Sequence, residues 1–145
     1  MAITTALCNS FKRELLGGIH DLDTDTIKVA LIASTHTGTY NASVSNYSDL
    51  TDDSDEVIGA GYTVGGPSLD GASITLDGST AFVDFSDEVI STATISASGA
   101  LLYNSSKEGR AIAVLDFGGT KISTNGDFTI VFPASNSTDA IIRIS

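Results

Sequence analysis

The chain has 145 residues, 41% of them hydrophobic and 17% charged, which is enough apolar material for one domain around a single core. Its 18 Asp and Glu residues outnumber its 7 Lys and Arg residues and give a formal net charge of -11. Because such a field repels the phosphates of nucleic acids and of anionic lipid surfaces, we expect no nucleic acid and no membrane among the partners.

A short helix is expected at the N-terminus, within residues 1–17. Apolar side chains recur there every four residues, at Ile3, Leu7, Phe11 and Leu15. Gly17 and Gly18 follow as the usual helix stop. A helix with so narrow an apolar stripe is marginal alone, so we expect it to pack against a sheet or a neighbouring subunit.

The next segment, 25–34, alternates apolar and polar residues and predicts a first strand. Residues 35–56 then lose this pattern in a run of Ser, Thr, Asn and Asp that includes Tyr40 and Tyr47. We expect a long irregular loop, which is unusual in a compact domain unless it is functional or ordered by a neighbour.

The second half of the chain predicts several short strands separated by turn residues, over 72–76, 80–85, 92–104, 109–117, 127–132 and 140–144. Asp77-Gly78 is a signal for a tight hairpin, and Asn125-Gly126 precedes the predicted strand 127–132. The strand 109–117 is apolar on both faces, so both of its faces should be covered, and it should end at Gly118-Gly119. We predict an all-β fold with one short helix: a single domain over 1–145, an antiparallel β-sandwich of Greek-key or jelly-roll type.

Few residues form a pattern that carries chemistry. Asp21, Asp23 and Asp25 alternate as at the start of a calcium loop, but Thr26 and Ile32 stand where such a loop needs Gly and Glu. We expect no metal site, and ion binding by this segment stays an open question.

Nucleophilic catalysis is not indicated either, since the serines lack a G-x-S-x-G elbow and the two histidines lie apart in loop-like settings. The only cysteine, Cys8, is expected to be packed beside the helix stripe rather than reactive, and it rules out an internal disulfide. We predict no catalytic residues, no cofactor and no enzymatic activity.

Several segments, in their order along the chain, resemble a family of small virion structural proteins of tailed bacteriophages. They are LCNSFK (7–12), ELL (14–16), IKVAL (27–31), GAGYT (59–63), TAFVDF (80–85), GALLYNS (99–105), RAIAVLDF (110–117) and AIIRI (140–144). The resemblance implies a non-catalytic virion component, made in the host cytoplasm. The first residues of the chain also lack the apolar core of a signal peptide, which agrees with that expectation.

Three functions stay open at this stage. The first is a decoration or cement protein on the outer capsid surface that stabilises the head, with the major capsid protein and copies of itself as partners. The second is a structural or receptor-binding module of the tail or neck. The third is a carbohydrate-binding or hydrolytic domain, which the absence of Trp disfavours. The residues expected to contact a partner come from the helix and the irregular loop: Leu7, Phe11, Tyr40 and Tyr47.

Overall fold

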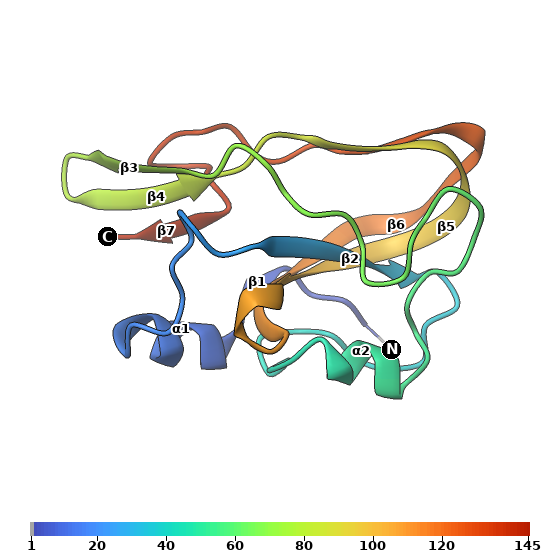
Figure 1. The fold of residues 1–145 in the computed structure, drawn as a ribbon, viewed down its shortest axis with the longest axis horizontal. Helices are drawn as coiled ribbons and strands as arrows, with labels where there is room; N and C mark the ends of the chain where they lie inside the picture. The colour runs from blue at the N-terminus through green and yellow to red at the C-terminus, as the bar shows by residue number, and fades with distance from the viewer. Residues whose placement is uncertain (1) are drawn as a thin grey trace.

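The computed structural model describes residues 2–145 and shows a mostly β chain with two antiparallel sheets and few short helices (Figure 1). The larger sheet contains, in spatial order, β1 (Ala6–Leu7), β6 (Arg110–Ile130), β5 (Glu88–Asn104) and β2 (Ile27–Ala33). The smaller sheet contains β3 (Ser73–Asp77), β4 (Thr80–Asp84) and β7 (Ile142–Ile144). The expected predominance of antiparallel strands is therefore confirmed.

The middle of the larger sheet is buried on both faces. Leu101 of β5 lies opposite Val114 of β6, and both are fully buried. On one side α1 (Asn9–Leu16) and α2 (Ser48–Asp52) lie below the sheet in Figure 1. The segment that follows α2 runs along the outer edge of β2. Isolated bridges join its residues Glu56 and Ser68 to Ile32 and Lys28 of β2. Buried residues of both sheets belong to one hydrophobic cluster.

The predicted end of the central strand at Gly118-Gly119 is wrong, because β6 continues to Ile130. Ala97 pairs with Lys121 and Gly99 pairs with Asp116, so residues 117–120 lie opposite the single residue Ser98. Gly118 and Gly119 adopt φ values of 74° and 141° in this bulge. The glycines therefore bend a continuous strand, and the β5–β6 ribbon is strongly curved in Figure 1.

The predicted helix over residues 1–17 is too long. Before α1, Thr4 donates a backbone hydrogen bond to Tyr40, and β1 pairs with β6 through Ala6 and Leu7. The interstrand hydrogen bonds hold residues 6–7 as a strand, because a short helix gains little from extending its own ladder. The predicted stop is confirmed, since Gly17 is the C-cap of α1 and Gly18 has a φ of 73°.

The predicted irregular loop over 35–56 is also partly structured, since it contains α2, and a 3-10 helix follows β5 over Ser105–Lys107. The prediction of a single helix is therefore wrong. Leu50 of α2 is fully buried, and this one apolar side chain anchors the short helix to the core. Propensity reasoning did not find α2, because five residues carry too little helical periodicity.

The predicted hairpin near Asp77-Gly78 is present one residue later. Asp77 and Thr80 pair across a two-residue connection, and Gly78 has a φ of 58°. The glycine supplies the left-handed backbone that this tight connection uses. The hairpin sets the register of β3 against β4, with Ile74 opposite Val83 and Leu76 opposite Ala81.

Ile112→Ala should lower the free energy of unfolding by about 2 to 5 kcal/mol, because Ile112 is fully buried in β6. Ile122→Ala in the same strand is the control, since Ile122 is 71% exposed and its loss should stay within about 0.5 kcal/mol. Denaturant unfolding measures both values, and equal losses would contradict the burial of the central strand.

Gly66→Ala should be much more destabilising than Gly118→Ala. Both glycines have a positive φ, 79° and 74°, so both substitutions strain the backbone by about 1 to 2 kcal/mol. A Cβ at Gly66 would lie 1.8 Å from the carbonyl oxygen of Val29, whereas a Cβ at Gly118 meets no heavy atom within 4 Å. Similar denaturation midpoints for the two variants would show that residue 66 does not pack against β2.

Candidate functional site

A line of buried polar side chains joins α1 to the end of β5. Glu14 accepts hydrogen bonds from Nη1 of Arg110 at 2.7 Å and from Nε2 of His20 at 3.0 Å. Nδ2 of Asn104 contacts Nδ1 of His20 at 3.0 Å and Oδ2 of Asp25 at 2.7 Å. The line therefore runs from a carboxylate through an imidazole and an amide to a second carboxylate.

The hydrogen bonds also define the tautomer of His20. Oδ1 of Asn104 accepts the backbone N–H of Ser106 at 3.1 Å, so the amide nitrogen of Asn104 faces the imidazole. Nδ1 of His20 therefore accepts, and its Nε2–H donates to Glu14. The imidazole is fully buried with both nitrogens engaged, so it has no open position from which to exchange a proton with a substrate.

The segment of Asp21, Asp23 and Asp25, which alternates as at the start of a calcium loop, does not have the arrangement of such a loop. Asp25 turns inward, where it accepts the backbone N–H of Asp21 at 3.0 Å in addition to the amide of Asn104. Asp21 and Asp23 are exposed. Within residues 2–145, no group of three or more His, Cys, Asp or Glu side chains is arranged to share a metal ion.

A second network holds the segment 35–56 closed on itself. The hydroxyl of Tyr40 donates to Oδ2 of Asp55 at 2.6 Å, and the same carboxylate accepts the N–H groups of Thr37 and Gly38 at 2.9 and 2.8 Å. Burial alone raises the pKa of Asp55, but these hydrogen bonds outweigh burial and hold the pKa below its ordinary value. Asp55 therefore acts as a structural anion that closes the loop around Tyr40.

Glu56 plays the same role for two other tyrosines. It accepts the hydroxyl of Tyr47, the hydroxyl of Tyr62 at 2.6 Å and the N–H of Gly65 at 2.6 Å. The ring of Tyr47 stacks on Tyr103 at 4.5 Å between centroids, and the Tyr103 hydroxyl donates to the carbonyl of Gly65. All four tyrosines of the chain are thus hydrogen-bonded to buried acids or to the backbone.

Sequence reasoning missed these two networks. The acidic run that contains Asp55 and Glu56 reads as a solvated loop, yet both carboxylates are buried. The only signal in the sequence is the presence of tyrosines nearby, and the chain does not reveal which hydroxyl meets which acid.

Of the four residues expected to contact a partner, two are buried and two are half-buried. Phe11 and Tyr40 are each only 1% exposed, whereas Leu7 and Tyr47 are half-buried, in β1 and in the stack with Tyr103. Contact with a partner stays a prediction for these residues. The first two offer a partner no side-chain surface in this structure, so a docking surface should be sought elsewhere.

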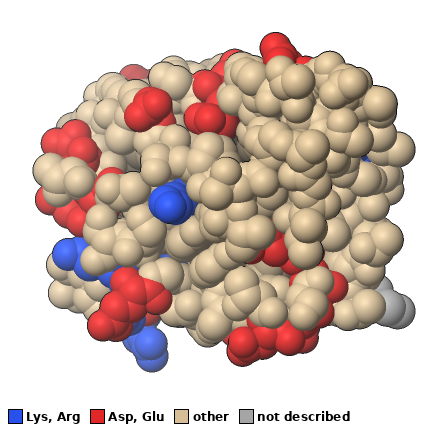
Figure 2. All heavy atoms as spheres, turned by 45° about the vertical axis from the view of Figure 1, so that its right-hand side comes forward, with Lys and Arg blue, Asp and Glu red and all other residues tan. Residues whose placement is uncertain are grey.

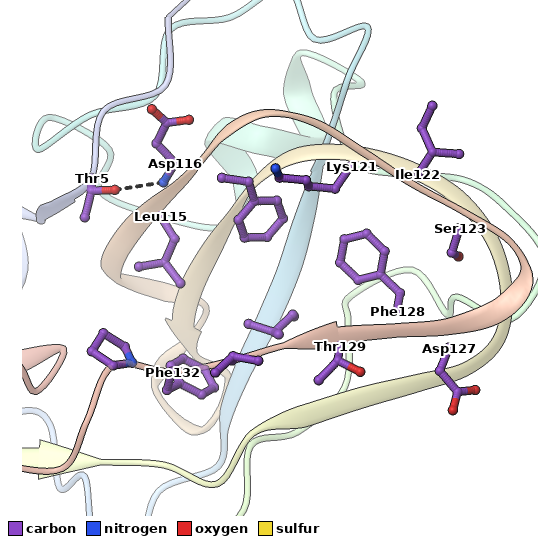
Figure 3. Close-up of a pocket in the computed structure, with 14 residues that line it drawn as sticks. Thr5, Leu115, Asp116, Lys121, Ile122, Ser123, Asp127, Phe128, Thr129 and Phe132 are labelled. Carbon is purple, nitrogen blue, oxygen red and sulfur yellow. Dashed lines mark hydrogen bonds between the residues drawn. The ribbon is translucent and has the colours of Figure 1, made fainter.

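One apolar region is the inner side of the curved β6 strand, shown in Figure 3. An open groove of about 510 Å³ lies there, lined by Leu115, Phe117, Phe128, Ile130 and Phe132 among others. Asp116 and Lys121 stand at its border, and the N–H of Asp116 is held by Oγ1 of Thr5 at 2.9 Å. The groove therefore has a mainly apolar floor and a border of mixed charge.

A second apolar region is one face of the small sheet, where the register of β3, β4 and β7 places six apolar residues. Ile74, Leu76 and Ile144 are exposed, Ala81 is half-buried, and Val83 and Ile142 are buried. A groove of about 370 Å³ separates this face from α1 and is lined also by Leu15 and Leu22. Leu76 and Leu16 are 71% and 91% exposed. Exposed apolar surface of this kind is typical of protein interaction sites.

Comparison with known proteins adds no relative. No family model, curated protein or solved structure matches the chain. No helix within residues 2–145 has the length and apolar character needed to cross a bilayer. The exposed apolar side chains of the small sheet are therefore the candidate contact surface.

Charge is distributed unevenly over the exterior. Figure 2 shows acidic side chains at several places around one side of the molecule, with broad areas between them that carry no charge. The formal charge of -11 means that a partner meets mainly acidic groups around these uncharged areas. Basic partners are favoured over acidic ones.

The network around Glu14 should make folding stability depend on acid pH. Burial raises the pKa of Glu14, but hydrogen bonds from His20 and Arg110 together hold it below its ordinary value of 4.5. The stabilisation is therefore complete above about pH 4.5 and is lost as the pH falls through the lower pKa of the folded protein.

Glu14→Gln removes this titration, so its unfolding free energy should fall less steeply than that of the parent as the pH drops below 4.5. Glu108→Gln is the matched control, because Glu108 is exposed. Parallel curves for the parent and Glu14→Gln would contradict the assigned role of Glu14.

Proposed function

We propose that this chain is a non-enzymatic structural protein of a tailed-phage virion, and that it decorates the outer surface of the capsid. The observation that carries the proposal is the set of exposed apolar side chains on one face of the small sheet beside α1, namely Ile74, Leu76 and Ile144. A face of this kind gains free energy when a protein surface covers it. The resemblance of the sequence to phage virion proteins supplies the particle on which the partner is found.

The sign of the charge favours the outside of a shell. A chain with a net charge of -11 would be repelled by packaged DNA on the inner side, whereas the outer side imposes no such cost. Acidic groups also limit self-association in solution, and this leaves the apolar face free for the assembled particle.

The two sheets would serve as a rigid platform. We infer that they pack in a sandwich-like arrangement, because buried residues from both, such as Val83 and Ile142 of the small sheet and Leu101 of the large one, belong to one cluster. The short segments that cover the sheet are fixed by the buried carboxylates of Asp55 and Glu56. A preorganised platform loses little conformational freedom on docking.

Decoration has a direct energetic meaning. A protein that binds only the assembled shell adds its binding free energy to the stability of that shell. Many copies on one particle each contribute a part, so the head resists disruption although each single contact is modest.

The purified protein should bind to heads that lack it and should raise the temperature at which those heads release DNA. Co-sedimentation measures binding, and electron microscopy of intact particles locates the bound copies. Tails and necks purified from the same phage serve as the comparison. Binding to tails or necks alone would replace the decoration proposal with a tail or neck structural or receptor-binding role.

A further inference from the structure

We propose that β3 is a docking edge for an extended segment of a partner protein, in which apolar residues alternate with Lys or Arg. The partner would add a strand to the small sheet next to β3. This inference rests on the proposed function only for the identity of the partner, a subunit of the particle. The chemistry of the segment is argued from β3 itself.

The backbone of β3 has one unpaired side. It is the outermost strand of the small sheet, at the upper left of Figure 1, and all five of its residues are exposed. Asp77 and Thr80 flank the two-residue turn and therefore exchange hydrogen bonds, as do Thr75 and Phe82. The N–H and C=O groups of Ile74 and Leu76 consequently point away from β4.

These outward groups meet no strand within residues 2–145, because β4 pairs with β7 on its other side and β3 pairs only with β4. Such an edge is a template for another extended chain. Edges that must stay unpaired usually carry a proline or an inward-pointing charge. β3 has no proline, and its one charged residue, Asp77, lies next to the turn on the face opposite Ile74 and Leu76.

The side chains along β3 alternate between an apolar and a polar face. Ile74 and Leu76 are 55% and 71% exposed on the face that borders the groove beside α1. An added strand would place every second side chain next to them, so those side chains should be apolar. Covering this pair would remove apolar surface from water without moving the hairpin.

The opposite face of the small sheet carries acidic side chains. Asp77 lies there, and so does Asp84, which is opposite Ser73. Within the described strands of the small sheet the one cation is Arg143, which is on β7 at the far edge and donates to the carbonyl of Thr138. The remaining side chains of the added strand would therefore lie beside Asp77 of β3, with Asp84 one strand further away on β4, and Lys or Arg suits these positions.

The same charges argue against a second copy of this chain as the occupant. Pairing β3 with β3 of another copy would bring two acidic hairpins together, each within a chain of net charge -11. A basic, apolar segment avoids that repulsion and gains attraction. The complementarity thus selects a heterologous partner over self-association.

The test uses the full chain and a short blocked peptide of alternating valine and lysine. The peptide should bind, and hydrogen exchange should slow at the amides of Ile74 and Leu76, which are otherwise open to water. A peptide of alternating valine and glutamate should bind at least about tenfold more weakly. Failure of the lysine peptide to bind, or equal binding of both peptides, would overturn the proposal.

Two variants make the test specific. Leu76→Lys should weaken binding of the lysine peptide by about tenfold or more, because it puts like charge at the edge. Ile122→Lys is the matched control, with the same 71% exposure at a distant site, and should bind like the parent. Leu76→Pro removes an outward N–H and breaks no hydrogen bond to β4, so it should fold and lose binding. If Leu76→Lys and Leu76→Pro both fold and still bind the lysine peptide like the parent, the proposal is overturned.

The same proteins added to heads separate this inference from the proposed function. If the parent does not bind heads but the peptide still binds at β3, the decoration role fails and the docking edge stands. If the parent and Leu76→Lys bind heads equally, decoration stands and the docking edge is overturned. A parent dimer that Leu76→Lys dissociates would identify a second copy as the occupant and would overturn the proposal as well.

Discussion

The pairing of β5 with β6 is the constraint on which the rest of the structure depends. Leu101 and Val114 meet where the sheet is apolar on both faces, so each face must be covered before the pair is stable. The chain meets this requirement with short pieces, chiefly α1, α2 and the segment that runs beside β2. The small sheet is connected to the end of the β5–β6 ribbon at which β5 begins and β6 ends.

Short covering pieces bury little apolar surface, and here carboxylates secure them. Glu14 holds α1 to β6 through Arg110, while Asp55 and Glu56 close the loop around the tyrosines. A buried carboxylate is costly unless it is fully hydrogen-bonded, and each of these three accepts at least two hydrogen bonds. These three buried carboxylates are thus engaged in hydrogen bonds that hold the fold together. The candidate contact surface on the small sheet consists of apolar side chains instead.

Local patterns in the sequence were enough to predict most strands, because alternation and turn residues act over a few positions. The strand of Ile27 and the hairpin at Gly78 follow this rule. The path of β6 past Gly118 was not predictable, since it depends on pairing with residues of β5 that lie 24 positions earlier at Lys121 and 42 positions earlier at Ile130. Helical periodicity extended α1 too far for the same reason, and the exposed face of β3 became visible only once the register was known.

The bulge at Gly118 and Gly119 has a consequence for engineering. Neither glycine has a heavy atom close to the position of an added Cβ. On either side of the bulge β6 is paired with β5, through Asp116 and through Lys121. A foreign peptide inserted between the two glycines would lengthen a connection that already departs from the ladder, at a small entropic cost. If the chain coats a particle as proposed, this site would present an inserted epitope many times over on one surface.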